Sequence, residues 1–259
     1  MSQPPFIAVS AEATLRRNAL LTFDALWQVA GELVDEPNRA RGGISSVTRL
    51  TLPGADGQQE CFYLKRQSNY RIRSLRHPLG QSTVAREFHN IELCNRLSIP
   101  SMEVAFFGER HANGELQAML LTRDLQGYLP LDHWFERWAE LDYRLQQELI
   151  CASAAIVARL HVCNAVHNCL YPKHLFLKPR ADGMGVRFID LEKLRLQPFS
   201  RRGRERDLDA LNRRSQAPSR TQRLRFMLSY LGKSRVDGEA RRWVQRVLKR
   251  SAKKHQRRR

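Results

Sequence analysis

Four features of the sequence, in chain order, carry residue types suited to phosphate chemistry. The first is the glycine pair Gly42-Gly43, where the absence of side chains lets backbone N–H groups approach phosphates closely. The second is Lys65, near the end of the next strand-like run, whose ammonium group can bind nucleotide phosphates. The third is Glu87, in a predicted helix, where a carboxylate can orient the lysine through an ion pair. Glu92 is the alternative partner for this lysine.

The fourth feature is the segment His167–Leu177, which reads HNCLYPKHLFL. It resembles the catalytic-loop pattern H-R-D-L-x-x-x-N of protein kinases, and it lies between a long predicted helix and a short predicted strand. Asp190 follows thirteen residues after Leu177, at the end of another hydrophobic run. A carboxylate at that place can hold Mg²⁺ against the β- and γ-phosphates of a nucleotide. Each feature alone is common, and their order is what predicts phosphoryl transfer.

The first half of the chain is predicted to be mainly β-structure with one prominent helix. Apolar–polar alternation and turn residues predict the strands, and apolar residues at helical spacing predict the helix. In order, we expect a helix or helix–strand mixture at Leu15–Val29, strands at Ile44–Leu52 and Cys61–Lys65 around the turn Pro53–Gly57, a polar connector at Arg66–Pro78, a helix at Ser82–Leu97, and strands at Glu103–Glu109 and Leu116–Thr122 around the turn Asn113-Gly114.

The second half is predicted to be mainly helical. We expect helices at Leu131–Trp138 and Tyr143–Val162, short strands at Leu175–Leu177 and Val186–Ile189, and a basic helical remainder with a polar break at Ser215–Ser219. A β-rich half joined by a short link to an α-rich half predicts an α+β fold with two lobes. The predicted domains are an N-lobe over residues 1–123, a helical C-lobe over residues 124–236 and a basic C-terminal tail over residues 237–259.

Length and composition exclude several classes of protein. The 259 residues, 42% of them hydrophobic, are enough for two lobes with their own cores. No run approaches the ~18 apolar residues of a spanning helix, and Met1–Ser10 lacks the pattern of a secretory signal. The five cysteines are odd in number and lack the spacing of a disulfide framework. We therefore expect reduced thiols and a cytoplasmic protein.

The net charge of +18 predicts an anionic partner. The segment Arg241–Arg259 contains ten Lys or Arg residues and no acidic residue. Three interpretations of this segment stay open: a solvated terminus, binding to an anionic membrane surface, where each basic group contributes about 1 kcal/mol, and binding to nucleic acid. Nucleic acid is the least favoured, because the sequence holds no recognised nucleic-acid-binding motif.

Several segments together resemble the lipopolysaccharide kinase family of Gram-negative bacteria, of the WaaP and InaA type, and are most similar to its InaA branch. They are Tyr63–Arg66, Arg73–Gly80 with Arg86-Glu87, Leu120–Gly127, His167–Leu177 and Ile189–Lys193, with weaker similarity at Arg206–Leu208 and Arg223–Phe226. The resemblance implies a two-lobed protein-kinase-like fold, with a β-rich N-lobe and an α-helical C-lobe. It also implies ATP- and Mg²⁺-dependent phosphorylation of a heptose in the lipopolysaccharide inner core. The implied partners are the core glycolipid and the anionic inner face of the inner membrane.

The resemblance assigns the candidate residues to three sets. They are nucleotide contacts at Gly42, Gly43, Lys65, Glu87, Thr122 and Asp124, metal ligands at Asp190 and His174, and catalytic groups at His167, Cys169 and Asp190. The adenine is expected at the link Thr122–Leu125. Because all three sets must serve one triphosphate, we predict that Lys65 and Glu87 face Asp190 across a cleft.

The chain departs from the kinase pattern at two positions. Cys169 stands where the pattern has its catalytic Asp, and His174 stands where it has the metal-binding Asn. A thiol, with a reference pKa of about 8.5, is mostly neutral at pH 7 and is a weak hydrogen-bond acceptor. Positioning and electrostatic stabilisation supply most of the catalysis of phosphoryl transfer, and His167 or His174 could take part of the role. An active kinase and a nucleotide-binding pseudokinase, acting as a binding or stress-related module, are therefore both kept.

A zinc site is a disfavoured alternative. His161, Cys163, His167 and Cys169 are all zinc-ligand types. Part of this set lies on a predicted helix, however, where residues two apart point away from each other. The four tryptophans are expected to pack inside the protein rather than stack on nucleic-acid bases.

Overall fold

The computed structural model describes residues 4–40, 42–74, 77–112 and 114–256. The chain forms two compact units. One, called here the strand-rich unit, comprises Met1–Leu93 and Met102–Gln126, and the other, the helical unit, comprises Cys94–Ser101 and Gly127–Arg259. The chain therefore enters the helical unit briefly at the end of a helix and returns to complete the sheet before it enters the helical unit again.

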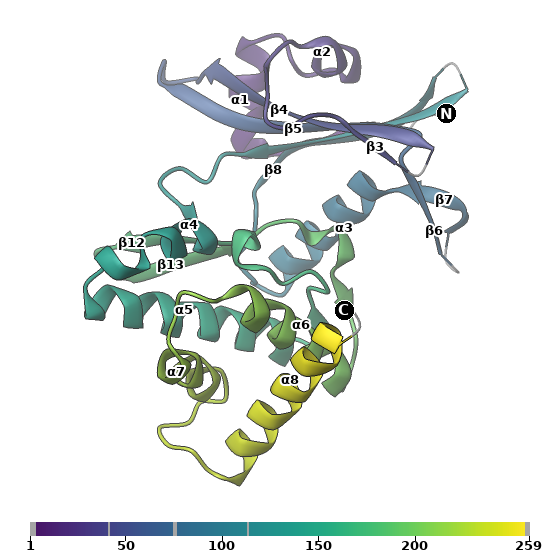
Figure 1. Cartoon of the computed structure of the whole chain (residues 1–259). Helices are drawn as coiled ribbons and strands as arrows, with labels where there is room; N and C mark the ends of the chain where they lie inside the picture. The colour runs from purple at the N-terminus through teal and green to yellow at the C-terminus, as the bar shows by residue number, and fades with distance from the viewer. Residues whose placement is uncertain (1–3, 41, 75–76, 113, 257–259) are drawn as a thin grey trace. The chain divides into compact units, whose positions relative to one another are not determined.

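The strand-rich unit is built on one antiparallel sheet of seven strands (Figure 1). In spatial order the strands are β1 (Phe6–Ile7), β8 (Val104–Ala112), β9 (Glu115–Arg123), β5 (Gln59–Ser68), β4 (Gly43–Pro53) and β2 (Glu32–Leu33), and β3 (Asn38–Ala40) also pairs with β4. Alternation decides which face of β4 is buried, since Thr48, Leu50 and Leu52 are buried and the residues between them are exposed. The four strands predicted from the sequence form the centre of this sheet.

Two short helices cover one face of the sheet, α1 (Val9–Arg17) and α2 (Phe23–Gln28) (Figure 1). The segment predicted as a helix or mixture is therefore the end of one helix and the whole of another. The link between α1 and α2 ends at Thr22. The Oγ1 of Thr22 accepts a hydrogen bond from Ala25 N at 3.2 Å and so caps the start of α2. The buried side chains between helices and sheet are Ala11, Leu15, Leu20, Leu26, Leu50, Leu52, Phe62, Leu64, Ala105, Phe106, Met119 and Leu121.

The segment predicted as a polar connector holds a hairpin. It consists of β6 (Arg71–Ser74) and β7 (His77–Ser82), which pair antiparallel with a register shift. The prediction is wrong here because polar strands that pair mainly with each other show no apolar alternation in the sequence. Leu75 and Arg76, in the same segment, and Asn113, in a predicted turn, lie outside the described residues.

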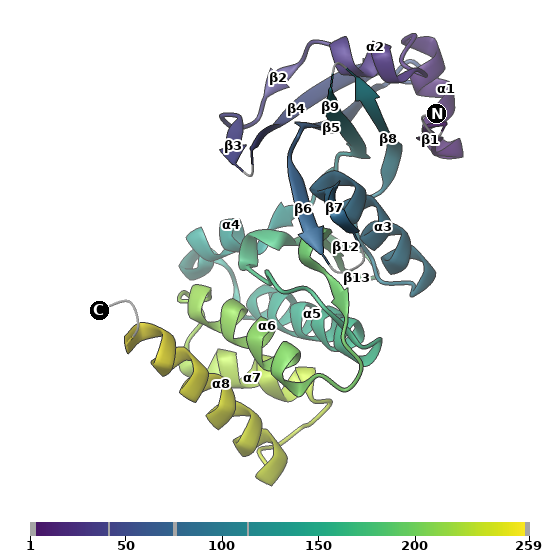
Figure 2. The same ribbon diagram turned by 90° about the vertical axis from the view of Figure 1, so that its right-hand side faces the viewer.

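The helical unit contains five α-helices among its described residues, α4 (Leu131–Glu136), α5 (Tyr143–Val162), α6 (Arg201–Arg214), α7 (Arg220–Tyr230) and α8 (Gly238–Gln256) (Figure 2). Short 3₁₀ helices are η1 (Trp138–Glu140), η2 (Pro172–His174) and η3 (Leu191–Lys193). Small sheets join β10 (Leu129–Pro130), β12 (Leu175–Arg180) and β13 (Gly183–Phe188), and pair β11 (Ala165–Val166) with β14 (Arg195–Leu196).

The long helix α5 is the central element of this unit. Its start is capped by Asp142, whose Oδ1 accepts a hydrogen bond from Leu145 N at 2.8 Å. Its apolar face, which includes Leu149, Val157 and Leu160, is buried and packs against α7 and β13. Both bounds of α5 agree with the helix predicted from the sequence.

The basic segment at the C-terminus forms the helix α8 over its described part, and Arg257–Arg259 lie outside the described residues. One face of α8 packs on α6 through buried Ala240 and Val247. Asp209 of α6 is fully buried and accepts a hydrogen bond from Ser251 Oγ at 2.7 Å. Burial raises the pKa of Asp209, but hydrogen bonds from Ser251 and Arg213 outweigh burial and hold this pKa below its usual value. Arg250 and Lys254 of α8 lie 3.6 and 3.4 Å from the same carboxylate, so part of the basic charge of α8 is paired with α6.

The predicted α+β fold class, with β-structure first and helices second, is confirmed. Among the described residues, no helix combines the length and the apolar composition needed to cross a membrane.

Candidate active site

The glycine pair forms the turn between β3 and β4. Ala40 pairs with Gly43 across this hairpin, and Gly42 has a φ of 76°, a conformation that glycine adopts without strain. A Cβ on Gly43 would lie only 2.2 Å from the backbone oxygen of Ser68. A cavity of about 450 Å³ adjoins the turn. Both glycines are thus required by the backbone itself, and their contact with phosphates stays a prediction.

Lys65 and Glu87 form the predicted ion pair. Lys65 lies in β5, between Val47 of β4 and Leu120 of β9. Its Nζ is 2.8 Å from Glu87 Oε2 on the helix α3 (Thr83–Arg96). The Glu87 side chain is only 6% exposed and that of Lys65 is 24% exposed. A pair this close and this shielded from water fixes the direction of the lysine side chain.

Gln67 explains why this pair forms. It lies two residues after Lys65 on β5, is 1% exposed, and donates from Nε2 to Thr83 Oγ1 at 2.8 Å. Its Oε1 accepts from Val84 N at 3.1 Å. The first turn of α3 is thus tied to β5, and Glu87 is positioned one turn farther along the helix. The sequence analysis did not identify Gln67, because a lone glutamine in a strand carries no recognisable signal.

Thr122 and Asp124 lie where β9 ends. Thr122 is buried and pairs with Tyr63 of β5. Asp124 N donates to Cys61 O at 2.9 Å, which continues the sheet bonding by one residue. The strand-rich unit ends two residues later, at Gln126. Contacts of these residues with an adenine ring stay a prediction.

In the helical unit, Asp207 anchors the segment that resembles a catalytic loop. This carboxylate on α6 is fully buried. It accepts hydrogen bonds from His167 N at 2.7 Å and from Asn168 N at 2.8 Å. His161 Nε2 lies 3.3 Å from the same carboxylate. A buried carboxylate that accepts two backbone N–H bonds fixes the course of the loop.

Asn168 adds a second set of constraints. It has a φ of 64°, a left-handed conformation that asparagine tolerates better than most residues. Its Nδ2 donates to Lys193 O at 2.9 Å, and its Oδ1 accepts from Arg206 Nη1 at 2.7 Å. The Asn168 side chain therefore anchors the segment after Asp190, through its hydrogen bond to Lys193 O.

Cys169 faces a lysine. Cys169 is 7% exposed, and Lys193 Nζ donates a hydrogen bond to Cys169 Sγ at 3.3 Å. Burial lowers the pKa of Lys193, but the hydrogen bond to Cys169 and nearby acidic groups raise this pKa above its usual value. Lys193 is therefore a cation at neutral pH, beside the only thiol in the predicted loop.

His174 and Asp190 lie together. His174 Nδ1 is 2.7 Å from Cys169 O, and because a carbonyl oxygen only accepts, Nδ1 carries the proton. Burial lowers the pKa of His174 despite the attraction of Asp190, so the ring is neutral at pH 7. Its Nε2 is then an acceptor, and it lies 3.3 Å from Asp190 Oδ2. Two acceptors at this distance leave a place for a shared cation.

Asp190 itself sits in an unusual backbone conformation. It has φ 56° and ψ 58°, and it directly precedes η3. Its neighbour Ile189 is held from both sides, since Ile189 N donates to His174 O and Ile189 O accepts from His167 Nε2 at 3.0 Å. A left-handed aspartate costs free energy, and residues held in this way concentrate at functional sites.

His167 is fully buried, and burial is the main reason that its pKa is lowered. Its Nε2 donates to Ile189 O, so it connects the loop with the strand that leads to Asp190. Its Nδ1 finds no hydrogen-bond partner among the residues that the structure describes. The structure thus brings His167, Cys169, His174 and Asp190 together, and separately joins Lys65 to Glu87. The predicted approach of Lys65 to Asp190 stays a prediction.

The family model for the lipopolysaccharide kinase (Kdo/WaaP) family matches residues 24–230. The chain belongs to this kinase family. The match includes both the strand-rich unit with Lys65 and Glu87 and the helical unit with Asp190.

Two relatives from Escherichia coli (strain K12) illustrate the similarity. Protein InaA is 29% identical over 175 residues, which are 67% of this chain and 78% of InaA. The lipopolysaccharide core heptose(I) kinase WaaP is 31% identical over 170 residues, which are 61% of this chain and 63% of WaaP. The similarity to InaA agrees with the branch predicted from the sequence.

A solved structure of WaaP in complex with acyl carrier protein is similar over 97% of this chain and 99% of that chain, with a TM-score of 0.68 and 20% identity. The predicted kinase-like fold is thereby confirmed. In this member of the lipopolysaccharide kinase family, Asp207 is the most important residue that the sequence analysis left without a role. A signal existed, since Asp207 is one of two aspartates in the strongly basic helix α6.

The lipopolysaccharide kinase family implies a divalent cation, and the residues present fit one in part. Asp190 and His174 supply two acceptors that face each other at 3.3 Å. Within the described residues, no three His, Cys, Asp or Glu side chains cluster as a complete metal site. Nucleotide phosphates would have to supply other ligands, which is how Mg²⁺ is usually held in kinases.

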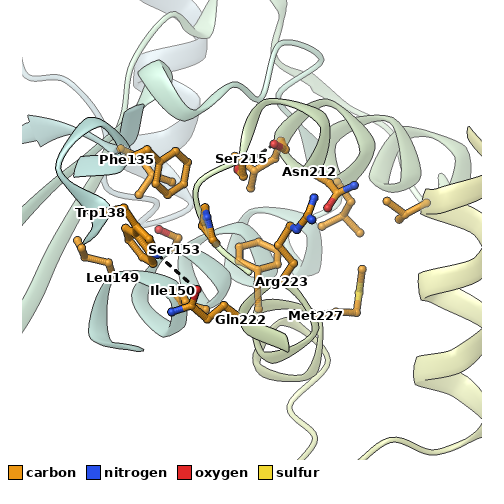
Figure 3. A pocket seen from close by; sticks show the side chains of 16 residues that line it. Phe135, Trp138, Leu149, Ile150, Ser153, Asn212, Ser215, Gln222, Arg223 and Met227 are labelled. Atoms are coloured by element: carbon orange, nitrogen blue, oxygen red, sulfur yellow. Dashed lines mark hydrogen bonds between the residues drawn. The ribbon is translucent and has the colours of Figure 1, made fainter. Parts of the chain in front are cut away.

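An apolar pocket lies between helices of the helical unit (Figure 3). Phe135, Trp138, Leu149 and Met227 point into it, and Trp138 Nε1 donates to Gln222 Oε1 at 3.3 Å across it. Its volume is about 60 Å³, well below the roughly 300–1,000 Å³ of small-molecule sites. None of the candidate active-site residues lines it.

Proposed function

We propose that this chain transfers a phosphoryl group from ATP to a sugar hydroxyl of the lipopolysaccharide inner core, in the manner of a heptose kinase. The observation that carries the proposal is the partly buried Lys65–Glu87 ion pair, with 2.8 Å between Nζ and Oε2. A lysine held in this way by a helix carboxylate is the group that binds the α- and β-phosphates in kinases. Similarity to the heptose kinase WaaP supports the sugar acceptor.

In this proposal each residue has one task. Lys65 binds nucleotide phosphates, Gly42 and Gly43 let the backbone approach them, and Thr122 and Asp124 lie at the adenine. Asp190 and His174 would hold Mg²⁺, which, when bound, neutralises charge on the β- and γ-phosphates. His167 is proposed as a catalytic group beside Cys169, and Asp207 positions the loop. The N-lobe (1–123), C-lobe (124–236) and C-terminal basic segment (237–259) are proposed as the functional domains.

Cys169 is proposed to lie at the acceptor hydroxyl. Lys193 Nζ, 3.3 Å from Sγ, would stabilise a thiolate after the thiol has lost its proton. The alternative is a catalytically impaired, InaA-like pseudokinase that binds nucleotide as a binding or stress-related module. Cys169 in place of a carboxylate favours this alternative, and the ion pair and Asp190 support nucleotide binding in both cases.

Nucleotide binding is tested by thermal unfolding. We expect saturating Mg²⁺-ATP to raise the melting temperature, because a ligand bound only by the folded state stabilises it. D190N should remove most of the Mg²⁺-dependent part of the increase. The exposed Asp182 in the β12–β13 turn provides the matched control, D182N, which should behave as wild type. An unchanged wild-type melting temperature would refute nucleotide binding.

A membrane role is proposed for the outward face of α8. Opposite the face packed on α6, this helix exposes Arg241, Arg242, Lys249 and Lys253, together with Leu248, which is 56% exposed. A basic face with an apolar residue suits an anionic lipid surface. The double variant R242Q/K249Q should lower binding to vesicles containing phosphatidylglycerol and leave nucleotide binding unchanged. Equal vesicle binding by the wild type and the double variant would contradict the proposal.

Acyl carrier protein is proposed as a further partner, since the similar WaaP structure is a complex with that protein. The apolar pocket of Figure 3 would have to widen before an acyl chain could enter it, because its volume is about 60 Å³. Co-elution of this chain with acylated carrier protein in size-exclusion chromatography tests the proposal. Separate elution at micromolar concentrations would refute it.

A further inference from the structure

A second cavity of the helical unit, of about 400 Å³, lies between α5 and the hairpin of β12 and β13. None of the residues assigned above to nucleotide, metal or catalysis lines it. Its volume is within the range of sites for small molecules. The proposed kinase reaction gives this cavity no role.

The charged groups that line the cavity are all positive. Arg159 comes from α5, Arg180 from β12 and Arg187 from β13, and none of the described lining residues is acidic. Arg159 and Arg180 are exposed residues. Three guanidinium groups from three elements therefore line this one cavity.

Tyr128 organises these cations. The guanidinium carbon of Arg180 lies 5.5 Å from the centre of its ring and that of Arg187 lies 5.9 Å from it. Arg180 also donates from Nη2 to Tyr128 Oη, and Arg187 Nη1 donates to Ser101 O at 2.8 Å. An aromatic ring beside a guanidinium restrains the cation without neutralising it. The donors of Arg180 and Arg187 are therefore ordered in advance of any ligand.

Small residues keep the cavity open. Ala152 and Ala155 line it from α5 and lie on the same helix face as Arg159. On the opposite side, a Cβ at Gly185 would lie 2.7 Å from Arg180 Nε and 2.9 Å from Tyr128 Oη. Larger side chains at these positions would occupy the space between the arginines.

We propose that this cavity binds a small phosphate monoester, such as a phosphorylated sugar. Guanidinium groups match phosphate oxygens in geometry and charge, and they form paired, charge-assisted hydrogen bonds with them. The alanines and Tyr128 offer apolar surface for the carbon skeleton of the ligand. The site is separate from the proposed nucleotide site, so its existence does not depend on the kinase activity.

The test is calorimetric titration of the full chain with glucose 6-phosphate, inorganic phosphate and glucose, in the absence of nucleotide. We expect saturable binding of both phosphates and none of glucose. A155E places a carboxylate one helical turn before Arg159, where it can pair with this arginine and stabilise α5. This variant should bind phosphate about tenfold more weakly or worse, with a melting temperature no lower than that of wild type.

The matched control is R144Q, which also lowers the charge of α5 by one. Arg144 has a 90% exposed side chain at the start of the helix and pairs with Glu148 away from the cavity. R144Q should bind both phosphates as wild type does. R180Q is a second variant, and we expect it to lower the affinity for phosphate by a similar factor. Wild-type affinity in A155E and R180Q, or an absence of phosphate binding by the wild type, would overturn the proposal.

Discussion

At the scale of single residues, the proposed chemistry depends on Cys169 and on the side chains that surround it. The thiol is nearly buried, Lys193 donates to it, and its own backbone oxygen accepts from His174. A carboxylate at this position would accept the same lysine hydrogen bond. The surroundings of Cys169 therefore suit an anion, which is the form in which a cysteine or an aspartate acts as a base.

Substitutions of Cys169 separate an active kinase from a pseudokinase. If the thiol takes part, C169A should lower phosphoryl transfer by the ~10²–10⁴-fold typical of a lost general base. C169D should retain or raise the rate. The measurement is phosphate incorporation into lipopolysaccharide core that lacks phosphate. Inert wild-type and C169D proteins that still bind nucleotide would favour the pseudokinase.

The two buried histidines predict how stability depends on pH. Burial lowers the pKa of His167 and of His174 below the reference value of 6.5. Between the folded and unfolded pKa values the unfolded chain binds more protons, so the free energy of unfolding falls as the pH drops below about 6.5. H174N should make this fall shallower, as measured by urea unfolding at pH 7.5 and pH 5.5. An unchanged pH dependence in H174N would contradict this explanation.

At the scale of secondary structure elements, one polar residue in each unit positions candidate site residues of that unit. Gln67 ties α3 to β5 in the strand-rich unit, and Asp207 ties α6 to the loop in the helical unit. Each satisfies backbone N–H groups that would otherwise be buried without partners. The positions of Glu87 and Cys169 thus depend on residues that do no chemistry themselves.

Removal of the Asp207 carboxylate should destabilise the protein. D207A leaves the N–H groups of His167 and Asn168 buried without acceptors, which should lower the free energy of unfolding by about 3 kcal/mol or more. The exposed D182N provides the control and should change it by less than about 0.5 kcal/mol. Urea unfolding measures both values. If D207A were as stable as the wild type, the loop would have to be held by other contacts.

The accuracy of the sequence predictions differs between elements for physical reasons. The strand β4 and the helix α5 were predicted because one face of each is buried, which produces periodic apolar residues. The strands β8 and β9 are buried on both faces over part of their length and were predicted as apolar runs around a turn signal. The hairpin of β6 and β7 was missed because its residues show no such period. Asp190 and Lys65 were found from chain order, whereas Gln67 and Asp207 act through contacts between elements, which a single sequence does not display.

At the scale of the whole molecule, some of the 44 Lys and Arg residues pair with buried acidic groups and others are exposed. Arg213 and Lys254 pair with buried Asp209 at 2.9 and 3.4 Å. The outward face of α8 and the arginine-lined cavity leave other basic groups for anionic ligands. The sequence predicted an anionic partner. It did not predict which basic residues are paired and which are exposed, because this depends on how α8 packs on α6.

The most direct test of the account is phosphoryl transfer itself. Purified protein, Mg²⁺-ATP and core oligosaccharide that retains heptose but lacks phosphate are incubated, and the mass of the oligosaccharide is measured. The account predicts a gain of one phosphate group with wild type and little or none with K65M or D190N. A core that gains no phosphate from the wild type, while a known heptose kinase modifies the same sample, would contradict it.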